Sequence, residues 1–314
     1  MVDLPRVVIA AATFKRPESL AELLDGIAAL DVQADVSVVI CDNDAEGAAG
    51  QAVVKRYAAT GTYPFPLEAI VAEQRGISHA RNGLFAHVSE HYDCDYIAII
   101  DDDETPCKTW LADLLAVAKD TNADVIGGPV LSVFADPNVS TAIKECEQFE
   151  RVSKPSGPVN VILSTENVMV RRAALDMVAA PWFDPAFAIT GGSDADFFYR
   201  LKFAGATFAW ADGAEVSELV PETRSNTGWV IKRNYRRGCN TAWRSLRRPN
   251  KLKSIPRILV LGVGGIVTFP LFWLSGWNNP TKQLNARLRL WRAYGYFSGF
   301  AQFQVQDYKE VHGK

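Results

Sequence analysis

The chain has 314 residues, of which 48% are hydrophobic and 22% are charged, and this balance is that of a globular protein with a substantial core. The five cysteines form neither a CxxC pair nor a recognisable disulfide framework, and no secretory signal opens the sequence. We therefore expect a protein of a reducing, cytoplasmic compartment rather than a secreted one.

The net charge of −3 conceals a strong asymmetry along the chain. From Thr223 to Gln306 there is no Asp or Glu, whereas fifteen Lys and Arg residues lie there together with many aromatic residues. An acidic body joined to a basic, aromatic-rich tail indicates that the tail meets an anionic partner. Membrane phospholipid, nucleic acid and a phosphorylated substrate are the candidates.

The first part of the chain alternates strand-like and helix-like segments. We expect strands at 6–13, 36–44, 67–73, 96–103 and 123–130, and helices at 16–30, 51–60, 77–90 and 109–120. Strands that alternate with helices in this way predict βαβ units and a mostly parallel sheet. Because ligands gather at the carboxyl ends of such strands, Asp42 and the triplet Asp101–Asp103 are expected at one rim.

The remainder of the chain is less regular. A strand that runs into a helix is expected at 164–175, and a Gly-rich turn that leads into a helix is expected at 189–205. Residues 258–277 carry no charge and would form a helix of roughly 30 Å, close to the thickness of a bilayer core. Pro270 and the four glycines of this run disfavour one uninterrupted helix.

The triplet Asp101–Asp103 directly follows the apolar strand YIAII. Like charges held this close repel one another, so the triplet is either a solvated turn or a site for a positive group. Carboxylates suit Mg²⁺ or Mn²⁺, and Mg²⁺ typically takes one or two of them together with substrate phosphates. A metal that bridges Asp103 and a diphosphate would describe a nucleotide-sugar site.

A series of motifs between residues 7 and 220 resembles one enzyme family. In order, the motifs read VVIAAATFKRPESL, VVICDND, EQRGISHARNGL, YIAIIDDDETPCKTWL, TENVMVRR and GGSDADFFYRLKFAG. Their order and spacing resemble those of family 2 glycosyltransferases, which have the GT-A fold. Within that family they are most similar to bacterial exopolysaccharide enzymes of the succinoglycan-glucosyltransferase type.

The resemblance implies a set of donor-binding residues. Thr13 and Arg16 match the loop that contacts the donor nucleotide, and Asp42 matches the aspartate that accepts a hydrogen bond from the uracil N–H. Arg75 matches a residue that flanks the nucleotide. Arg81, in the same motif, is assigned either to the nucleotide or to a structural pair.

The resemblance also implies a separate role for each aspartate of the acidic triplet. The resemblance implies that Asp102 faces the ribose or the sugar hydroxyls and that Asp103 holds Mg²⁺ or Mn²⁺ and, through it, the diphosphate. Asp101 would mainly support the turn. Glu215 and Glu218 match a region that often approaches the donor or the metal.

The acceptor side rests on the sequence GGSDADFF. Family members usually carry Glu-Asp here, and the Asp is the catalytic base, so Asp194 is the implied base and Ser193 replaces the usual Glu. Asp196 is the alternative base. Either aspartate would otherwise cap the helix that begins near Phe197.

Three arginines in the sequence KRNYRRGCNTAW are further candidates. Arg233, Arg236 and Arg237 would contact the donor diphosphate or an anionic acceptor, unless they simply form a solvated basic face. Ser193 is a further candidate contact of the acceptor. The QxxRW signature of processive synthases is absent from this segment, which favours the transfer of one sugar per encounter.

The basic tail fits a membrane surface better than it fits nucleic acid. Its cations would be attracted to an anionic cytoplasmic leaflet, and its Trp and Tyr residues are the types that lie at headgroup level. The residues Arg287, Arg289 and Arg292 interleave with apolar ones as in an interfacial helix. We expect 258–277 to lie on or partly in the membrane, with a full span or a packed core helix as alternatives. No nucleic-acid partner is expected.

These observations together predict an α/β protein of GT-A type, Rossmann-like, with a mostly parallel sheet flanked by helices. Residues 1–222 would form the catalytic domain, with a nucleotide-sugar half (1–130) and an acceptor half (131–222), and 223–314 a helical membrane-association region.

The predicted activity is the inverting, metal-dependent transfer of a hexose from a UDP-sugar to a polyprenyl-diphosphate-linked oligosaccharide. It would take place at the cytoplasmic face of the bacterial inner membrane, in surface polysaccharide assembly. Direct transfer to polyprenyl phosphate and a non-catalytic nucleotide-sugar-binding scaffold are the alternatives.

Overall fold

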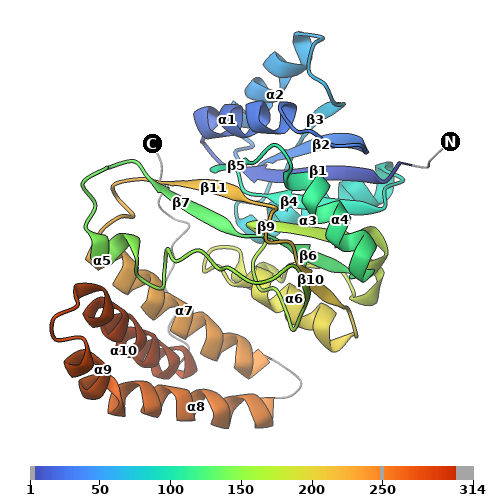
Figure 1. The fold of residues 1–314 in the computed structure, drawn as a ribbon. Coiled ribbons are helices and arrows are strands. Elements are labelled where there is room, and N and C mark those ends of the chain that lie inside the picture. The colour runs from blue at the N-terminus through green and yellow to red at the C-terminus, as the bar shows by residue number, and fades with distance from the viewer. Residues whose placement is uncertain (1–3, 248–250, 302–314) are drawn as a thin grey trace.

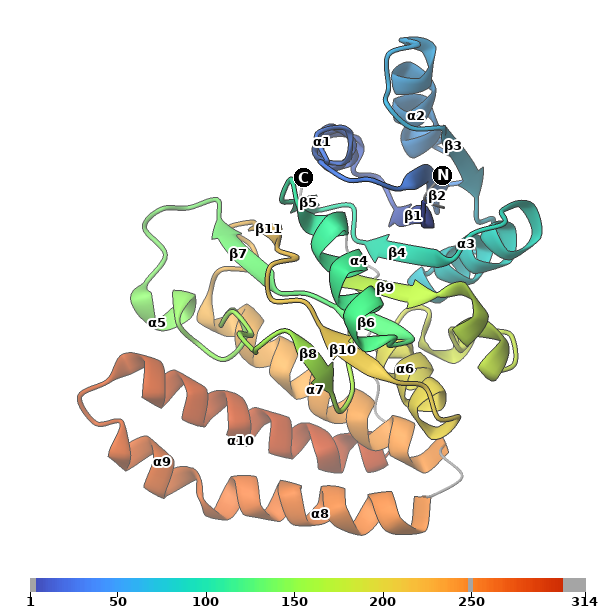
Figure 2. The ribbon, with the colours of Figure 1, turned by 45° about the vertical axis from the view of Figure 1, so that its right-hand side comes forward.

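The protein consists of an α/β body and four C-terminal helices that pack along one side of it (Figure 1). The computed structural model describes residues 4–247 and 251–301. A view turned by 45° shows the same two layers, with the C-terminal helices beside the body rather than extending away from it (Figure 2).

The body is built on an eight-stranded sheet, and most of its strands are parallel, as predicted. The strand order is β3 (Leu67–Val71), β2 (Asp35–Asp42), β1 (Arg6–Thr13), β4 (Tyr96–Ile100), β9 (Asn167–Arg171), β6 (Val125–Gly127), β10 (Phe208–Trp210) and β8 (Gly157–Val159). The antiparallel strands are β9, which lies between β4 and β6, and β8 at the edge.

Helices cover both faces of the sheet, which explains why the strands are nearly all apolar. Successive residues of β1 enter opposite cores: Ile9 lies in one and Val8 in the other. The first core is covered by α1 (Pro17–Ala28), α2 (Ala49–Ala59) and α4 (Trp110–Thr121), and the second by α3 (Ile77–His91) and α6 (Ser193–Phe203). Leu20, Leu23, Leu24 and Ile27 of α1 are fully buried.

The strand expected at 123–130 is in fact two strands in different sheets. β6 ends at Gly127, and β7 (Val130–Phe134) joins a second, three-stranded sheet with β11 (Val216–Val220) and β5 (Glu104–Pro106). Gly128 has no room for a side chain beside the Ala214 carbonyl, and Pro129 has no N–H for a ladder, so the chain turns there. The expected strand 96–103 likewise ends early, at Ile100, which leaves the acidic triplet in the turn before β5.

The C-terminal helices are held to one another through glycines. They are α7 (Thr227–Arg247), α8 (Lys251–Val267), α9 (Phe269–Ser275) and α10 (Pro280–Phe300). A side chain at Gly238 would collide with the Arg292 carbonyl, and one at Gly295 would collide with the Tyr235 carbonyl. The backbones of α7 and α10 therefore touch, and Leu284 and Leu288 of α10 are buried in a small core with Val230 of α7. Because Leu288 is buried, α10 is a packed helix rather than the free interfacial helix expected from its sequence.

The uncharged run 258–277 is broken, as its proline predicts. α8 and α9 meet at an angle of 47° around Thr268, because Pro270 cannot donate a helical hydrogen bond and its ring would clash with a preceding carbonyl. In the part of the chain that the structure describes, no helix alone is both long and apolar enough to cross a membrane, whereas Ser254–Val267 and Phe269–Ser275 together meet that test as a bent pair.

We predict that Gly295→Val destabilises the protein by about 1–3 kcal/mol or more, because overpacking forces α10 away from α7. Gly264→Ala is the matched control, since open space surrounds Gly264 on α8 and alanine favours the helix. Thermal unfolding of both variants measures the difference. Equal melting temperatures of the two variants would contradict close backbone packing.

Candidate active site

A cavity of about 300 Å³ lies where the carboxyl ends of β1 and β4 meet β11 and α7. This is the rim at which the sequence places the acidic triplet. Its charged lining consists of six carboxylates and six guanidiniums, from Asp101, Asp102, Asp103, Glu104, Glu166 and Glu218 and from Arg16, Arg75, Arg81, Arg224, Arg233 and Arg236.

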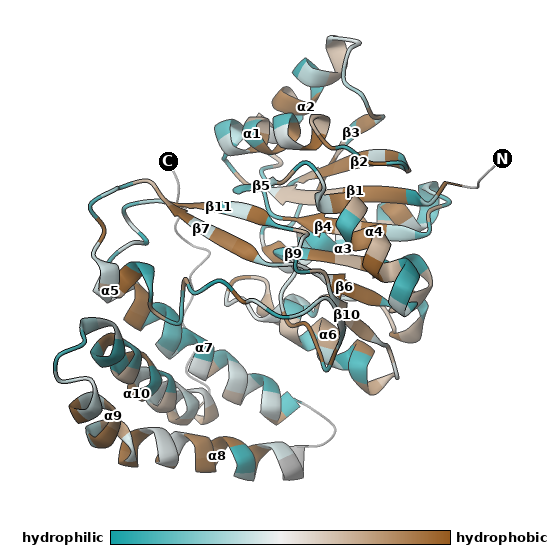
Figure 3. Cartoon of the chain, in the orientation of Figure 1, coloured by the Kyte–Doolittle hydropathy of each residue, from teal (hydrophilic) through white to brown (hydrophobic). Residues whose placement is uncertain are grey.

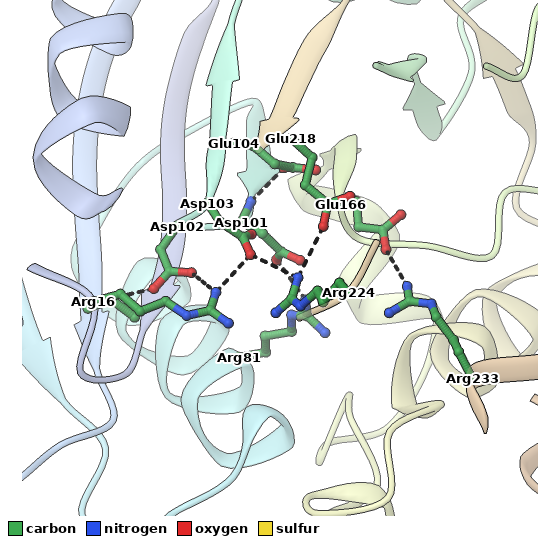
Figure 4. Close-up of polar contacts among 11 residues, drawn as sticks. Arg16, Arg81, Asp101, Asp102, Asp103, Glu104, Glu166, Glu218, Arg224 and Arg233 are labelled. Carbon is green, nitrogen blue, oxygen red and sulfur yellow. Dashed lines mark hydrogen bonds and ion pairs between the residues drawn. The ribbon is translucent and has the colours of Figure 1, made fainter. Parts of the chain in front are cut away.

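Asp102 is fixed by the loop that follows β1. Because β1 and β4 are parallel neighbours in register, with Ala10 opposite Ile99, the segments that leave them meet at the same edge. Thr13 Oγ1 donates to Asp102 Oδ2 over 2.8 Å, and Arg16 donates to Asp102 Oδ1 over 2.9 Å. The structure therefore brings together Thr13, Arg16 and Asp102, three of the residues predicted to bind the donor. Figure 4 shows the contact between Arg16 and Asp102.

Asp103 lies between two guanidiniums. Arg16 donates to Asp103 Oδ2 over 2.8 Å, and Arg224 reaches the same oxygen over 3.4 Å. Arg224 also donates to Glu218 over 3.2 Å, so it joins the acidic triplet to β11. Glu218 in turn stands directly across from Glu104 of β5 in the antiparallel pairing.

The carboxylates of this site repel one another and are poorly solvated. Burial raises the pKa of Asp101 and of Asp102 to about 6, with repulsion from Asp103 adding to the rise in both. Burial, together with repulsion from Asp103, raises the pKa of Glu218 to about 7. Burial also raises the pKa of Glu104 well above its ordinary value. Close to the triplet, the five carboxyl groups of Asp101, Asp102, Asp103, Glu104 and Glu218 outnumber the three guanidiniums that pair with them, those of Arg16, Arg81 and Arg224.

The local excess of carboxylates suits a divalent cation that binds together with a diphosphate. The Asp103 side chain is 19% exposed and so is reachable from the cavity. Mg²⁺ characteristically uses one or two protein carboxylates and completes its shell with phosphates and water. Among the described residues, no three His, Cys, Asp or Glu side chains are arranged to hold a metal ion by themselves.

Arg81 links the acidic triplet to the predicted base. Its guanidinium is buried and donates to Asp101 over 2.9 Å and to Asp194 Oδ1 over 2.6 Å. Ser193 Oγ donates to the same Asp194 oxygen over 3.1 Å. Asp194 lies in the first turn of α6 and is not among the residues that line the cavity, so it stands beside the cavity, behind Arg81. Arg81 thus makes structural pairs, and because it also lines the cavity, its contact with the nucleotide stays a prediction.

Asp42 has a different environment from the one its predicted role requires. It is fully buried, and its two carboxylate oxygens accept hydrogen bonds from the backbone N–H groups of Asp44 and Gln51. Asn43, the next residue, lines the cavity instead and ties the loop after β3 to β2 by accepting from Gly76 N. Asp42 does not line the cavity, and its recognition of the nucleotide base remains a prediction.

The remaining predicted residues divide between the cavity and its surroundings. Arg75 lines the cavity, and its guanidinium lies 4.8 Å from the centre of the Phe14 ring. Asp196 pairs with Arg200 over 2.9 Å, as expected of a structural residue on α6. Arg233 and Arg236 line the cavity from α7, whereas Arg237 does not.

Sequence reasoning missed Arg224 and Glu166. Arg224 lies in the turn before α7 and pairs with Asp103, and Glu166 lies 3.8 Å from Arg233. Glu166 directly precedes β9 and reaches the carboxyl ends of the parallel strands only because β9 runs antiparallel to β4, a reversal that its motif does not reveal. Arg224 offered no signal either, because no local pattern distinguishes it from the other tail arginines.

We predict that the protein without ligands loses stability as the pH rises from about 5 to 8. A carboxyl whose folded-state pKa is raised, as that of Glu218 is to about 7, favours the fold while it is protonated, and this contribution is lost as the pH passes that pKa. Glu218→Gln should therefore flatten the dependence of the melting temperature on pH. Glu90→Gln, at an exposed position on α3, is the control. An unchanged slope in Glu218→Gln would contradict the described crowding.

The sequence of this chain matches those of a known protein family. The sequence pattern of Glycosyl transferase family 2 matches residues 8–178, and that of Glycosyl transferase family group 2 matches residues 96–301. The succinoglycan biosynthesis protein ExoM of Rhizobium meliloti (strain 1021) is 33% identical over 233 residues, which are 73% of this chain and 72% of ExoM.

Solved structures share the fold. The mannosyltransferase PcManGT from Pyrobaculum calidifontis, in complex with GDP-Man and Mn²⁺, has a TM-score of 0.60 at 16% identity, covering 96% of this chain and 88% of PcManGT. S. aureus TarS 1–349 in complex with UDP-GlcNAc has a TM-score of 0.53 at 15% identity, covering 95% of this chain and 92% of TarS. They confirm the expected GT-A architecture. By its sequence, the chain belongs to the family 2 glycosyltransferases.

Proposed function

We propose that this glycosyltransferase moves a hexose from a UDP-sugar to a hydroxyl of a lipid-linked oligosaccharide, with inversion and with the help of a divalent metal ion. The observation that carries the proposal is the double pairing of Arg81. One guanidinium joins Asp101 of the acidic triplet to Asp194, over 2.9 and 2.6 Å. The predicted base is thus tied through buried Arg81 to Asp101, the turn-supporting member of the acidic triplet.

The donor's diphosphate fits the part of the cavity around Asp103. Arg16 and Arg224 flank this carboxylate and supply guanidiniums that bind phosphate oxygens well. A Mg²⁺ or Mn²⁺ ion shared by Asp103 and the diphosphate would supply positive charge where the leaving group becomes more negative. Asp102, held by Thr13 and Arg16, is then the carboxylate available to donor hydroxyls.

Asp194 is the group that takes the proton from the acceptor hydroxyl. Arg81 and Ser193 both donate to its Oδ1, and within the described part of the chain no group donates to Oδ2. The Asp194 side chain is 25% exposed, and Oδ2 is the atom that we assign to receive the proton of the acceptor. Ser193, in the place of the usual glutamate, contributes by holding Asp194 rather than by a charge. A single attack from the side opposite the diphosphate inverts the anomeric centre.

The named relatives support the choice of donor and pathway. The S. aureus TarS structures contain UDP-GlcNAc and UDP, and the PcManGT structure contains a nucleotide sugar with Mn²⁺. ExoM, the relative at 33% identity, is named for succinoglycan biosynthesis. We therefore place this chain in exopolysaccharide biosynthesis, with UDP as the nucleotide and glucose or a related hexose as the sugar.

The surface of α8 and α9 supports attachment to the cytoplasmic face of the bacterial inner membrane. Apolar residues recur along both helices, which Figure 3 shows as brown bands, and many of their side chains are exposed. The exposed members are Leu259, Val260, Leu261, Val263, Val267, Leu271, Phe272, Leu274 and Trp277. Together with the anion-free sequence around them, they fit a peripheral or monotopic position on an anionic leaflet, where a lipid-linked acceptor is found.

We predict that Asp194→Asn lowers kcat for sugar transfer by about 10²–10⁴-fold, since an amide cannot take the acceptor's proton, and leaves UDP-sugar binding in place. Asp103→Asn should instead lower metal-dependent release of UDP on the order of 10²-fold. Both are measured with purified protein, a panel of UDP-hexoses and Mg²⁺ or Mn²⁺.

The control for both variants is Asp176→Asn, which alters an exposed aspartate that pairs with Arg172 away from the cavity. Asp194→Asn that transfers as fast as the parent would contradict the base assignment and favour direct transfer to polyprenyl phosphate, an anion that needs no base. An absence of UDP release with every sugar would favour the non-catalytic scaffold.

We predict that Val263→Asp/Leu271→Asp lowers flotation with phosphatidylglycerol vesicles several-fold, because it places charges in the exposed apolar surface of α8 and α9. Phe203→Asp alters an equally exposed apolar side chain at the end of α6 and should float as the parent does. Equal flotation of the double variant and the parent would rule out this surface as the attachment site.

A further inference from the structure

Four arginines form a cluster next to the active-site cavity. Arg233, Arg236 and Arg237 lie on α7, with Arg233 and Arg237 one helical turn apart on the same face. Arg292 comes from α10, and the glycine contacts between α7 and α10 bring it close enough for its guanidinium to donate to Asn234 Oδ1 over 2.5 Å. We call these four residues the arginine cluster.

Two members of the arginine cluster pair with carboxylates, and Arg237 pairs with no described side chain. Arg233 lies 3.8 Å from Glu166, and Arg292 lies 2.5 Å from Glu147. Within residues 4–247 and 251–301, no acceptor lies within hydrogen-bonding distance of the Arg237 guanidinium, and the Nε atoms of Arg233 and Arg292 are buried without an acceptor. N–H donors of Arg233, Arg237 and Arg292 thus have no acceptor within the described residues.

The charges of the cluster act on one another. Arg237 has an exposed surface, yet the protein around its guanidinium and the nearby Arg233, Arg292 and Arg236 lower its pKa to about 10. A guanidinium that is destabilised in this way gains most from an added anion. Phosphate groups are the anions whose geometry guanidiniums match best.

The cluster is distinct from the part of the cavity assigned to the donor. The donor's diphosphate already has Arg16 and Arg224 beside Asp103. Arg233 and Arg236 line the cavity, whereas Arg237 and Arg292 do not. The cluster therefore begins at the cavity edge and continues away from it along α7 toward α10.

We propose that the arginine cluster binds the diphosphate group of the acceptor, at a second anion site separate from that of the donor diphosphate. The proposal rests on the proposed function, in which the acceptor carries such a group. Contacts of this kind, remote from the reacting hydroxyl, orient a substrate toward the base without touching the reacting atoms.

The test is calorimetric titration of inorganic pyrophosphate into the full chain in the presence of EDTA, so that no metal site contributes. The parent should bind pyrophosphate, and Arg237→Gln should weaken binding at least about tenfold, the loss expected for a charge-assisted hydrogen bond. Arg237 is exposed and pairs with no described side chain, so its variant should fold. Arg224→Gln, which alters the donor region, should bind pyrophosphate as the parent does.

Arg247→Gln is the matched control, because Arg247 lies on the same helix and pairs with Asp184 instead. In the transfer assay, Arg237→Gln should raise KM for the acceptor at least about tenfold and leave KM for the UDP-sugar unchanged. Pyrophosphate binding that is lost in Arg224→Gln and kept in Arg237→Gln would overturn the proposal. Lowered flotation of Arg237→Gln with phosphatidylglycerol vesicles, without lowered pyrophosphate binding, would also overturn it, in favour of lipid headgroups.

The proposed sugar transfer and the proposed second anion site can be refuted separately. If UDP-hexose turnover is normal and pyrophosphate binding does not depend on Arg237, the second anion site is wrong and the transferase assignment stands. If pyrophosphate binding depends on Arg237 but no UDP-hexose is turned over, the anion site stands and the proposed function is wrong.

Discussion

The structure of the active site depends on one electrostatic constraint: carboxylates from four segments are held together in a poorly solvated place. The turn after β4 contributes the acidic triplet, β5 and β11 contribute Glu104 and Glu218, and the segment before β9 contributes Glu166. Carboxyl groups this close together in a poorly solvated place are stable only if cations lie between them or if some of them stay protonated. The protein uses both means, since buried arginines pair with the triplet while burial raises the pKa of Glu218 to about 7.

The arginines that neutralise the acidic set also connect the parts of the fold. Arg16 joins the loop after β1 to the triplet, Arg224 joins the triplet to β11 and the approach to α7, and Arg81 joins it to α6. Asp194, the acidic triplet and the start of α7 are therefore positioned by the same network. The glycine contacts hold the backbone of α10 against that of α7. They thereby position the arginine cluster and the apolar surface of α8 and α9 relative to the cavity.

The sequence predicted the parts of the site that follow from local patterns. Strand periodicity and the carboxyl-end rule placed Asp102 and Asp103 at one rim, and family motifs added Thr13 and Arg16, which the structure brings into contact with them. It did not predict Arg224, because its partner Asp103 is far away in the chain and its neighbours are other arginines. The sequence also did not predict that β6 and β7 belong to different sheets. This separation follows from the contact of Gly128 with the Ala214 backbone, which no local pattern indicates. The burial of Asp42 likewise depends on the turn into α2, not on its motif.

The central claim is that Asp103 and a divalent cation together accept the diphosphate of the donor. It is tested most directly by calorimetric titration of UDP into the protein with Mn²⁺ and, separately, with EDTA. The account predicts that UDP binds with Mn²⁺ at least an order of magnitude more tightly than with EDTA, and that Asp103→Asn abolishes the difference. Equal affinities under the two conditions, or an undiminished difference in Asp103→Asn, would contradict it.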